Sequence, residues 1–168
     1  MNEEQTHTAA EADRLFAVQY HGQTWELLER PDRSGDEDEL MLHTAHASCR
    51  HWLAVGTPVH HQRGEWLIAR VYTVLGIPEA AVRHATRCLA LTEAHADAMA
   101  DFDRAFAYEG IARAQALAGD RDQALRYVAL AEQAGEAIGD AEDREAFFAE
   151  LLGGSWYSVR EAAGGPPP

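Results

Sequence analysis

The sequence predicts an all-α fold made of antiparallel helical hairpins, and three observations lead to this prediction. Alanine is by far the commonest residue whereas valine and isoleucine are sparse, a composition that favours helix over sheet. Breaks that contain glycine or proline divide the chain into apolar-periodic segments of about 15 to 20 residues, joined by about two to five residues. The internal prolines Pro31, Pro58 and Pro78 all lie at such breaks, where helices tolerate them. We therefore expect about seven helices.

The first two helices are expected from about Ala9 to Arg30 and from Ser34 to Val55. The first contains apolar residues that supply its buried faces, namely Leu15, Phe16, Val18, Tyr20, Trp25 and Leu28. Ser34 is a preferred N-cap residue, and the acidic residues 36–39 favour the positive end of the helix dipole. Gly56 is suited to end the second helix.

The remaining five helices are separated by short joints, three of which contain glycine, whereas residues 95–97 form the other. We expect them at Val59–Leu75, Glu79–Ala94, Ala98–Ala118, Asp122–Ile138 and Ala141–Leu152. Trp156 and Tyr157 follow the last helix and are candidates for covering one end of the fold or joining a dimer interface. Residues 9–160 are expected to form a single helical-repeat domain, with disordered tails at 1–8 and at the Gly/Pro-rich residues 161–168.

Composition and charge exclude several classes of function. The chain has 168 residues, of which 46% are hydrophobic and 25% charged, as in soluble globular proteins. Its 28 acidic and 14 basic residues give a net charge of −14, which argues against nucleic-acid binding. No apolar run is long enough to span a membrane, and no secretory signal is visible at the N-terminus. We expect a cytoplasmic protein whose two cysteines are free thiols.

An internal repeat supports the hairpin interpretation. Gly76 and Gly119 stand 43 residues apart, each after an apolar segment. The positions around them carry matching residues: Ile68 and Ile111, Ala69 and Ala112, Ala81 and Ala124, and Cys88 and Ala131. Glycine ends the first helix of each hairpin, and small residues at fixed spacing allow its two helices to approach closely.

This pattern resembles the tetratricopeptide repeat over about residues 62–138. The large–small pairs, the inter-helix glycines and the second-helix alanines all match, with Tyr72 at the aromatic position of the first repeat and Tyr108 at an early-helix aromatic position of the second. The period of 43 exceeds the usual length of about 34 and looks like the expanded form of kinesin-light-chain-type repeats. Gln115 replaces the second aromatic residue.

Two further departures concern the end of each repeat, where Glu93 and Glu136 stand in place of the closing proline. The resemblance implies a short right-handed array of helical hairpins with a terminal capping helix. It also implies a non-catalytic module that binds or scaffolds a protein or peptide, with self-association through an exposed helical face as a further expectation. No cofactor is implied.

In this kind of repeat the first helix of each hairpin lines a concave groove. Position by position, the resemblance places Arg63, Trp66, Arg70, Phe106, Glu109 and Arg113 in that groove. Arg70 and Arg113 are equivalent positions, and two such guanidiniums suit a carboxylate or an acidic peptide because each grips oxygen atoms bidentately.

A structural interpretation of the same charges remains open. Glu109 and Arg113 are four residues apart on one helix and can neutralise each other. Asp103 with an arginine of the third helix, or Glu65 with Arg70, can likewise form ion pairs that only stabilise the fold.

A metal-binding bundle or small metalloenzyme is the competing hypothesis. The candidate ligands recur at helical spacing and are His43, His46, Cys49, His84 and Cys88. No established zinc, phosphate-binding or nucleophile motif accompanies them. A third hypothesis, ranked last because the acidic residues are spread along the chain, is that the acidic surface mimics nucleic acid or docks on a basic partner.

Overall fold

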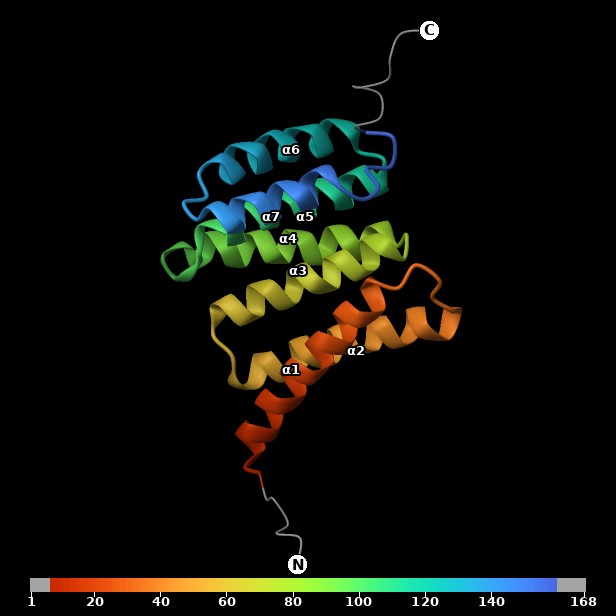
Figure 1. The fold of residues 1–168 in the computed structure, drawn as a ribbon, viewed down its shortest axis with the longest axis vertical. Helices are drawn as coiled ribbons and strands as arrows, with labels where there is room; N and C mark the ends of the chain where they lie inside the picture. Colours follow the sequence, from red (N-terminus) through yellow and green to blue (C-terminus); the bar gives the residue numbers. More distant parts are fainter. Residues whose placement is uncertain (1–6, 160–168) are drawn as a thin grey trace, which may run out of the picture.

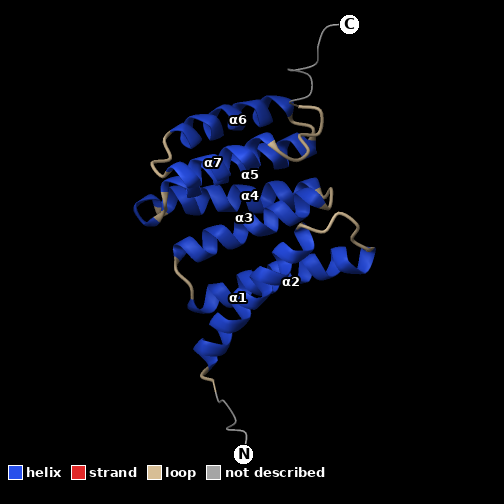
Figure 2. Cartoon of the chain, in the orientation of Figure 1, coloured by secondary structure: helices blue, strands red, loops and turns tan. Residues whose placement is uncertain are grey.

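The computed structural model describes residues 7–159, which form α-helices and one short 3₁₀ turn and contain no strand (Figures 1 and 2). The expected all-α class is therefore confirmed. The elements are α1 (Ala9–Leu28), α2 (Gly35–Val55), α3 (Pro58–Val74), α4 (Pro78–Ala94), η1 (Ala96–Ala98), α5 (Asp101–Ala118), α6 (Arg121–Glu136) and α7 (Ala141–Leu152). No helix within residues 7–159 is both long enough and apolar enough to cross a membrane.

The helices pack as three successive hairpins, α1/α2, α3/α4 and α5/α6, with α7 added against α5 and α6. Figure 1 shows them stacked along the long axis of the molecule, from α1 and α2 at one end to α6 at the other. The first helices of the second and third hairpins, α3 and α5, also touch directly. This contact brings one face of α3 and one face of α5 side by side.

The turns of the second and third hairpins have the same geometry, as the internal repeat predicts. Gly76 and Gly119 adopt φ angles of +72° and +81°, the left-handed region that favours glycine. The Ile77 N–H donates to the Tyr72 carbonyl over 2.9 Å, and the equivalent Asp120 N–H donates to the Gln115 carbonyl over 3.0 Å. Both hairpins therefore close with the same C-terminal helix cap.

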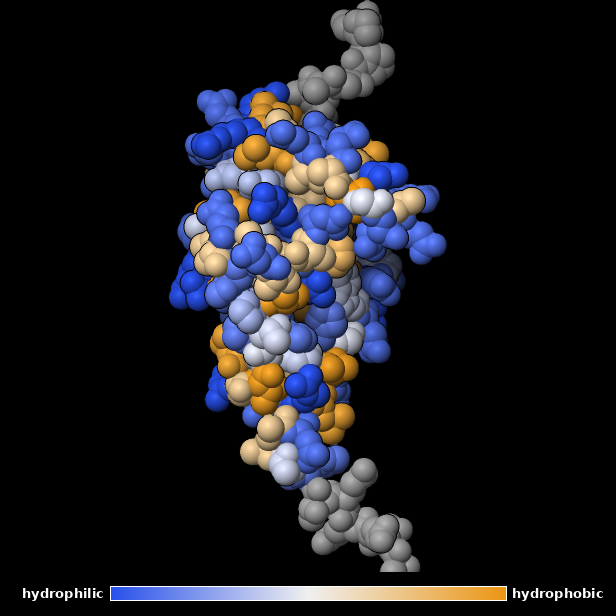
Figure 3. Space-filling view, turned by 90° about the vertical axis from the view of Figure 1, so that its left-hand side faces the viewer, coloured by the Kyte–Doolittle hydropathy of each residue, from blue (hydrophilic) through white to orange (hydrophobic). Residues whose placement is uncertain are grey.

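The matching residues of the repeat all lie in the core. The eight matching residues are all buried, and they are Ile68, Ala69, Ala81, Cys88, Ile111, Ala112, Ala124 and Ala131. At the α1 end of the array, by contrast, several large hydrophobic side chains are exposed to solvent. Hydrophobic residues gather near the α1 end of the face drawn in Figure 3, and Leu15, Val18 and Leu53 of α1 and α2 are more than half exposed.

Several helix boundaries differ from the sequence-based expectation by one to three residues, and side chains explain two of these differences. Helix α1 ends at Leu28 rather than Arg30, because the Arg33 guanidinium donates to the carbonyls of Leu27 and Arg30 over 3.0 and 2.7 Å. Helix α5 begins at Asp101 rather than Ala98, because the carboxylate of residue 103 accepts the N–H of residue 100 over 2.9 Å. Alanine-rich composition alone does not reveal such caps.

The segment after α7 packs back onto the last hairpin. Trp156 is buried in the same core cluster as side chains of α5, α6 and α7, and its indole N–H donates to the Leu151 carbonyl over 3.1 Å. The Tyr157 hydroxyl donates to the Thr73 carbonyl of α3 over 2.7 Å. Trp156 is therefore part of the core of the last hairpin. The tails expected at 1–8 and 161–168 lie outside the described residues, apart from residues 7 and 8.

Candidate functional site

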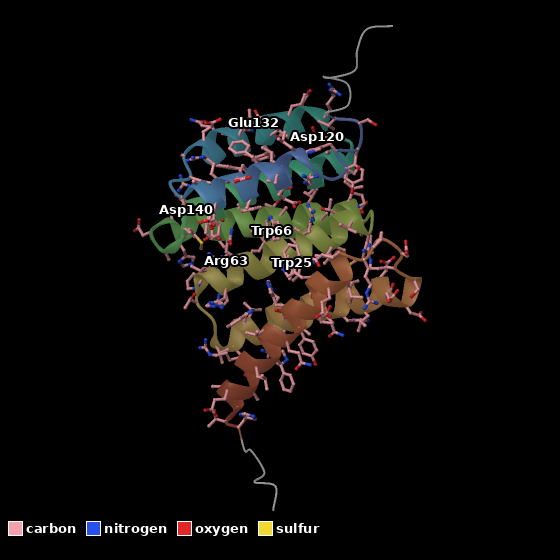
Figure 4. All side chains as sticks on the ribbon, in the orientation of Figure 1. Trp25, Arg63, Trp66, Asp120, Glu132 and Asp140 are labelled. Carbon is pink, nitrogen blue, oxygen red and sulfur yellow. The ribbon has the colours of Figure 1, made fainter. Side chains whose placement is uncertain are left out.

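One hollow in the described part of the chain is a cavity of about 330 Å³. It is formed where α1, α3, α5 and α7 face one another, and α1, α3 and α5 are each the first helix of a hairpin. The lining residues are His21, Trp25, Gln62, Arg63, Trp66, Phe102, Asp103, Phe106, Ala146 and Glu150. Figure 4 labels Trp25, Trp66 and Arg63, which lie close together where α1 meets α3.

Four aromatic rings form the walls of this cavity, and we therefore call it the aromatic cavity. Trp25 and Trp66 are stacked, with centroids 6.0 Å apart and planes 28° apart. Trp66 meets Phe106 edge to face at 5.6 Å, and Phe106 meets Phe102 edge to face at 6.4 Å. The Trp66 indole N–H donates to the Phe106 carbonyl over 3.1 Å, which fixes the ring against α5. These contacts hold the apolar walls in one arrangement.

Arg63 lies at the edge of the cavity and is held by two interactions. Its Nε and Nη2 donate to the two carboxylate oxygens of Asp103 over 2.8 and 3.1 Å, and its guanidinium carbon lies 5.0 Å from the centroid of the Phe102 ring. The Asp103 side chain is 3% exposed, whereas that of Arg63 is 48% exposed. The ion pair expected between Asp103 and an arginine of the third helix is thus present, and it forms part of the cavity wall.

Gln62 provides a buried polar group in the lining. Its Nε2 donates to the Thr92 hydroxyl over 3.0 Å and to the Asp103 carbonyl over 3.3 Å. A carbonyl can only accept, so these partners fix which end of the amide is the nitrogen. The other end, Oε1, is buried and has no hydrogen-bond partner among the described residues.

Behind the aromatic cavity, four charged side chains join α3, α5 and α7. Arg70 Nη2 forms an ion pair with a carboxylate oxygen of Glu150 at 2.5 Å, and Arg70 Nη1 lies 3.8 Å from a carboxylate oxygen of Glu109. Glu109 and Arg113 form an ion pair, and both side chains are buried. Burial raises the pKa of Glu109, against the opposing effect of the two arginine charges. The ion pair expected between residues 109 and 113 is therefore present.

Arg113 also holds the segment after α7 against the rest of the fold. Its guanidinium donates to the carbonyls of Glu150, Gly153 and Ser155 over 2.6, 2.9 and 3.0 Å. The guanidinium carbon lies 4.3 Å from the centroid of the Trp156 ring. A single buried arginine thus donates to three carbonyls at and beyond the end of α7, where helical hydrogen bonding stops.

The six groove residues expected from the repeat resemblance divide into two groups. Arg63, Trp66 and Phe106 line the aromatic cavity. Arg70, Glu109 and Arg113 lie instead around a void of only about 10 Å³. Glu65 does not pair with Arg70 as expected. A Glu65 carboxylate oxygen lies instead 2.6 Å from Nδ1 of His84. Both equivalent arginines are engaged with carboxylates.

Sequence reasoning missed the contributions of α1 and α7 to the cavity. His21 and Trp25 come from α1, and Ala146 and Glu150 come from α7; neither helix lies within the detected repeat. The Trp25 indole N–H donates to His21 Nε2 over 3.1 Å, and burial lowers the pKa of His21. Phe102 was also missed, although its spacing of four residues from Phe106 places both on one face of a helix.

A smaller hollow of about 200 Å³ adjoins the aromatic cavity and shares His21 and Arg63 with it. Its other lining residues are Val18, Trp52, His60 and Gly64. The Trp52 and His60 rings are stacked with centroids 4.1 Å apart. The two hollows together extend along α1 and α3.

The two histidines proposed as metal ligands on α2 and α4, His46 and His84, have protein partners in the structure. His46 Nε2 lies 3.0 Å from the Tyr72 hydroxyl, and His84 Nδ1 lies 2.6 Å from a Glu65 oxygen. The two imidazole centroids are 5.5 Å apart. Burial raises the pKa of the Cys49 thiol to about 11 and that of the Cys88 thiol further still, which disfavours the thiolate that binds metals. No three histidine, cysteine, aspartate or glutamate side chains within residues 7–159 are placed to hold a metal ion; His43, the fifth candidate, lies on α2.

Comparison of the chain with protein-family models, curated protein sequences and solved structures gives no match. The function is therefore inferred from the aromatic cavity itself. Its lining combines half-buried aromatic rings with hydrogen-bonding and charged groups that are fixed from several helices. Such an arrangement is suited to binding an organic group and orienting it.

Proposed function

We propose that this protein is a non-catalytic peptide- or protein-binding module of tetratricopeptide-like type, and that its aromatic cavity receives a side chain of the partner. The observation that carries the proposal is the convergence of four aromatic rings from α1, α3 and α5 around one open cavity. Half-buried tryptophan and phenylalanine rings in a concave site supply most of the binding energy in many protein interfaces.

The size and rigidity of the cavity support this proposal. A volume of about 330 Å³ lies at the lower end of the range of about 300 to 1,000 Å³ typical of ligand sites and suits one large side chain. Trp66 is fixed by its hydrogen bond to α5, and Trp25 is fixed by its hydrogen bond to His21. A site whose walls are already ordered loses little conformational entropy when it binds.

The repeat pattern supports the same assignment. The first helices of the hairpins provide most of the cavity lining, which is the face that the tetratricopeptide resemblance assigns to ligand binding. We include in the proposal that the three hairpins form a right-handed array, with α7 as its capping helix. The acidic partner expected from Arg70 and Arg113 is not part of it, because carboxylates of the chain itself engage both guanidiniums.

The proposal is tested by selecting peptides from a displayed random library on the immobilised protein. Each selected peptide is then titrated calorimetrically against the wild-type protein and against Trp25→Ala. Trp25 is suited to this test because it is half-buried on a terminal helix, so its removal leaves the central hairpins intact. We expect the dissociation constant to rise about tenfold or more.

Leu152→Ala is the control, because Leu152 lies on α7, is 70% exposed and does not line the cavity. Binding to this variant should equal binding to the wild type. If no peptide is selected, or if selected peptides bind a folded Trp25→Ala variant as tightly as the wild type, the proposal is wrong.

A further inference from the structure

The aromatic cavity contains a hydrogen-bond acceptor that lacks a donor. Gln62 is 1% exposed and lines the cavity, its Nε2 is directed to α4 and to the α5 backbone, and its Oε1 has no partner among the described residues. A buried carbonyl oxygen without a donor costs free energy in the unbound protein. Oε1 itself has almost no solvent-accessible surface in the unbound protein, so a ligand N–H pairs with it only when the Gln62 side chain turns toward the cavity, and that pairing removes the cost.

The aromatic walls favour a particular kind of donor. The faces of tryptophan and phenylalanine rings carry partial negative charge and attract cations. The protein already uses this property at the edge of the same site, where the Arg63 guanidinium lies 5.0 Å from the Phe102 centroid. Trp25 and Trp66 present further ring surface in the lining, and that surface carries no cation of the chain itself within the described residues.

The charge of the whole chain acts in the same direction. Asp103 and Glu150 lie in the lining, and each is neutralised by an arginine of α3. The local balance is therefore close to neutral, whereas the chain as a whole carries −14. A net charge of this size attracts basic ligands and repels acidic ones over distances of about 10 Å at moderate salt.

We infer that the aromatic cavity recognises a cationic side chain, the guanidinium of an arginine or the ammonium of a lysine, in a basic segment of its partner. The cation lies against the Trp25 and Trp66 rings and donates to Gln62 Oε1. This inference rests on the proposed function, because it names the chemistry of the partner at that site.

The test uses four small probes of matched length: the N-acetyl methylamides of arginine, lysine, citrulline and norleucine. Citrulline keeps the shape and N–H donors of arginine without its charge, and norleucine keeps only the alkyl chain. Each probe is titrated into ¹⁵N-labelled protein, and the indole N–H signals of Trp25 and Trp66 are followed. We expect the arginine or lysine probe to bind about fivefold or more tightly than citrulline and norleucine.

Two variants assign the selectivity to the residues named. Trp25→Leu keeps an apolar wall but removes a ring face, and Gln62→Met keeps the volume but removes the acceptor. Both should reduce the preference for the charged probe to about twofold or less, while binding of norleucine changes little. Tyr127→Leu, an aromatic-to-leucine change on α6 outside the cavity lining, should keep the preference. Because Gln62→Met also loses bonds to Thr92 and Asp103, Trp25→Leu decides the matter if Gln62→Met fails to fold.

The outcomes separate this inference from the proposed function. If norleucine binds as tightly as arginine and lysine, or if Trp25→Leu keeps the full preference, the cavity binds side chains without selecting a cation and the inference is wrong. If no probe shifts either indole signal and library selection also fails, the proposed function is itself wrong.

Discussion

Arg113 was expected to line a ligand groove, but its contacts indicate that it stabilises the fold. Its side chain is 3% exposed, pairs with the equally buried Glu109 and donates to three carbonyls near the end of α7. Removal of one partner from a buried ion pair leaves the other charge without compensation. Arg113 is thus expected to contribute to stability rather than to partner binding.

We predict that Arg113→Ala lowers the free energy of unfolding by about 3 to 5 kcal/mol. Arg126→Ala, which removes an exposed arginine of α6, should change it by about 0.5 kcal/mol or less. Urea denaturation followed by circular dichroism measures both values. Replacement of Glu109 and Arg113 together by methionine should recover much of the loss, because no unpaired charge then stays buried. A loss below about 1 kcal/mol in Arg113→Ala would contradict this assignment.

The residues also show what a repeat pattern can and cannot predict about a site. The pattern assigns Trp66 and Phe106 to the first helices of their hairpins, and both line the aromatic cavity. The partners of Arg70 and Arg113 were not predictable in full, because Glu150 and residues 153–155 come from a segment outside the repeat. Nor does any sequence signal show that Gln62 Oε1 is left without a donor, since that depends on three helices at once.

At the scale of the elements, helix contacts depend on glycine in some places and tolerate a side chain in others. A Cβ at Gly135 of α6 would lie 2.4 Å from Cε1 of Phe147, a fully buried ring of α7 that has no room to move. A Cβ at Gly22 of α1 would meet no atom within 4 Å. The two positions therefore make a matched pair.

We predict that Gly135→Ala lowers the free energy of unfolding by about 1 to 3 kcal/mol, because α6 and α7 must separate. Gly22→Ala should raise it by about 0.5 to 1 kcal/mol, because alanine favours a helix interior more than glycine does. Thermal and urea unfolding of the two variants provide the comparison. Equal effects of the two substitutions would show that the Phe147 ring of α7 does not pack against Gly135 of α6.

The ends of individual helices were predictable where residues next to them in the sequence form the cap. Ser34 caps α2 with Glu37 in a capping box, and glycines in the left-handed region end α3 and α5. The early end of α1 and the late start of α5 were not predictable, because Arg33 and Asp103 act there through side-chain hydrogen bonds to the backbone. The 3₁₀ turn of residues 96–98 is alanine-rich and looks helical in sequence.

At the scale of the whole molecule, stability should fall as the pH is lowered below neutrality. Burial lowers the pKa of His21, His46 and His60, so the folded protein takes up protons less readily than the unfolded chain, whose histidines titrate near pH 6.5. Protonation of these histidines therefore favours unfolding. Glu109 acts in the opposite direction, because its raised pKa makes its protonation favour the folded state.

We predict that the free energy of unfolding decreases between about pH 7.5 and about pH 5.5, and that His46→Gln weakens this decrease. His46 is suited to the test because burial and the nearby His84 lower its pKa, while Glu65 opposes that effect. His95→Gln, at an exposed position after α4, should leave the pH dependence unchanged. A stability that is flat or rises on acidification would contradict the predicted sign.

The central claim is that the aromatic cavity is the binding site of this protein, and the four tryptophans allow a direct measurement. Trp25 and Trp66 line the cavity, whereas Trp52 and Trp156 do not. A peptide selected on the wild-type protein is titrated into protein labelled with ¹⁵N at the indole nitrogens. We predict saturable shifts of the Trp25 and Trp66 signals, with the Trp156 signal unchanged. Saturable binding that leaves both cavity signals in place would contradict the claim.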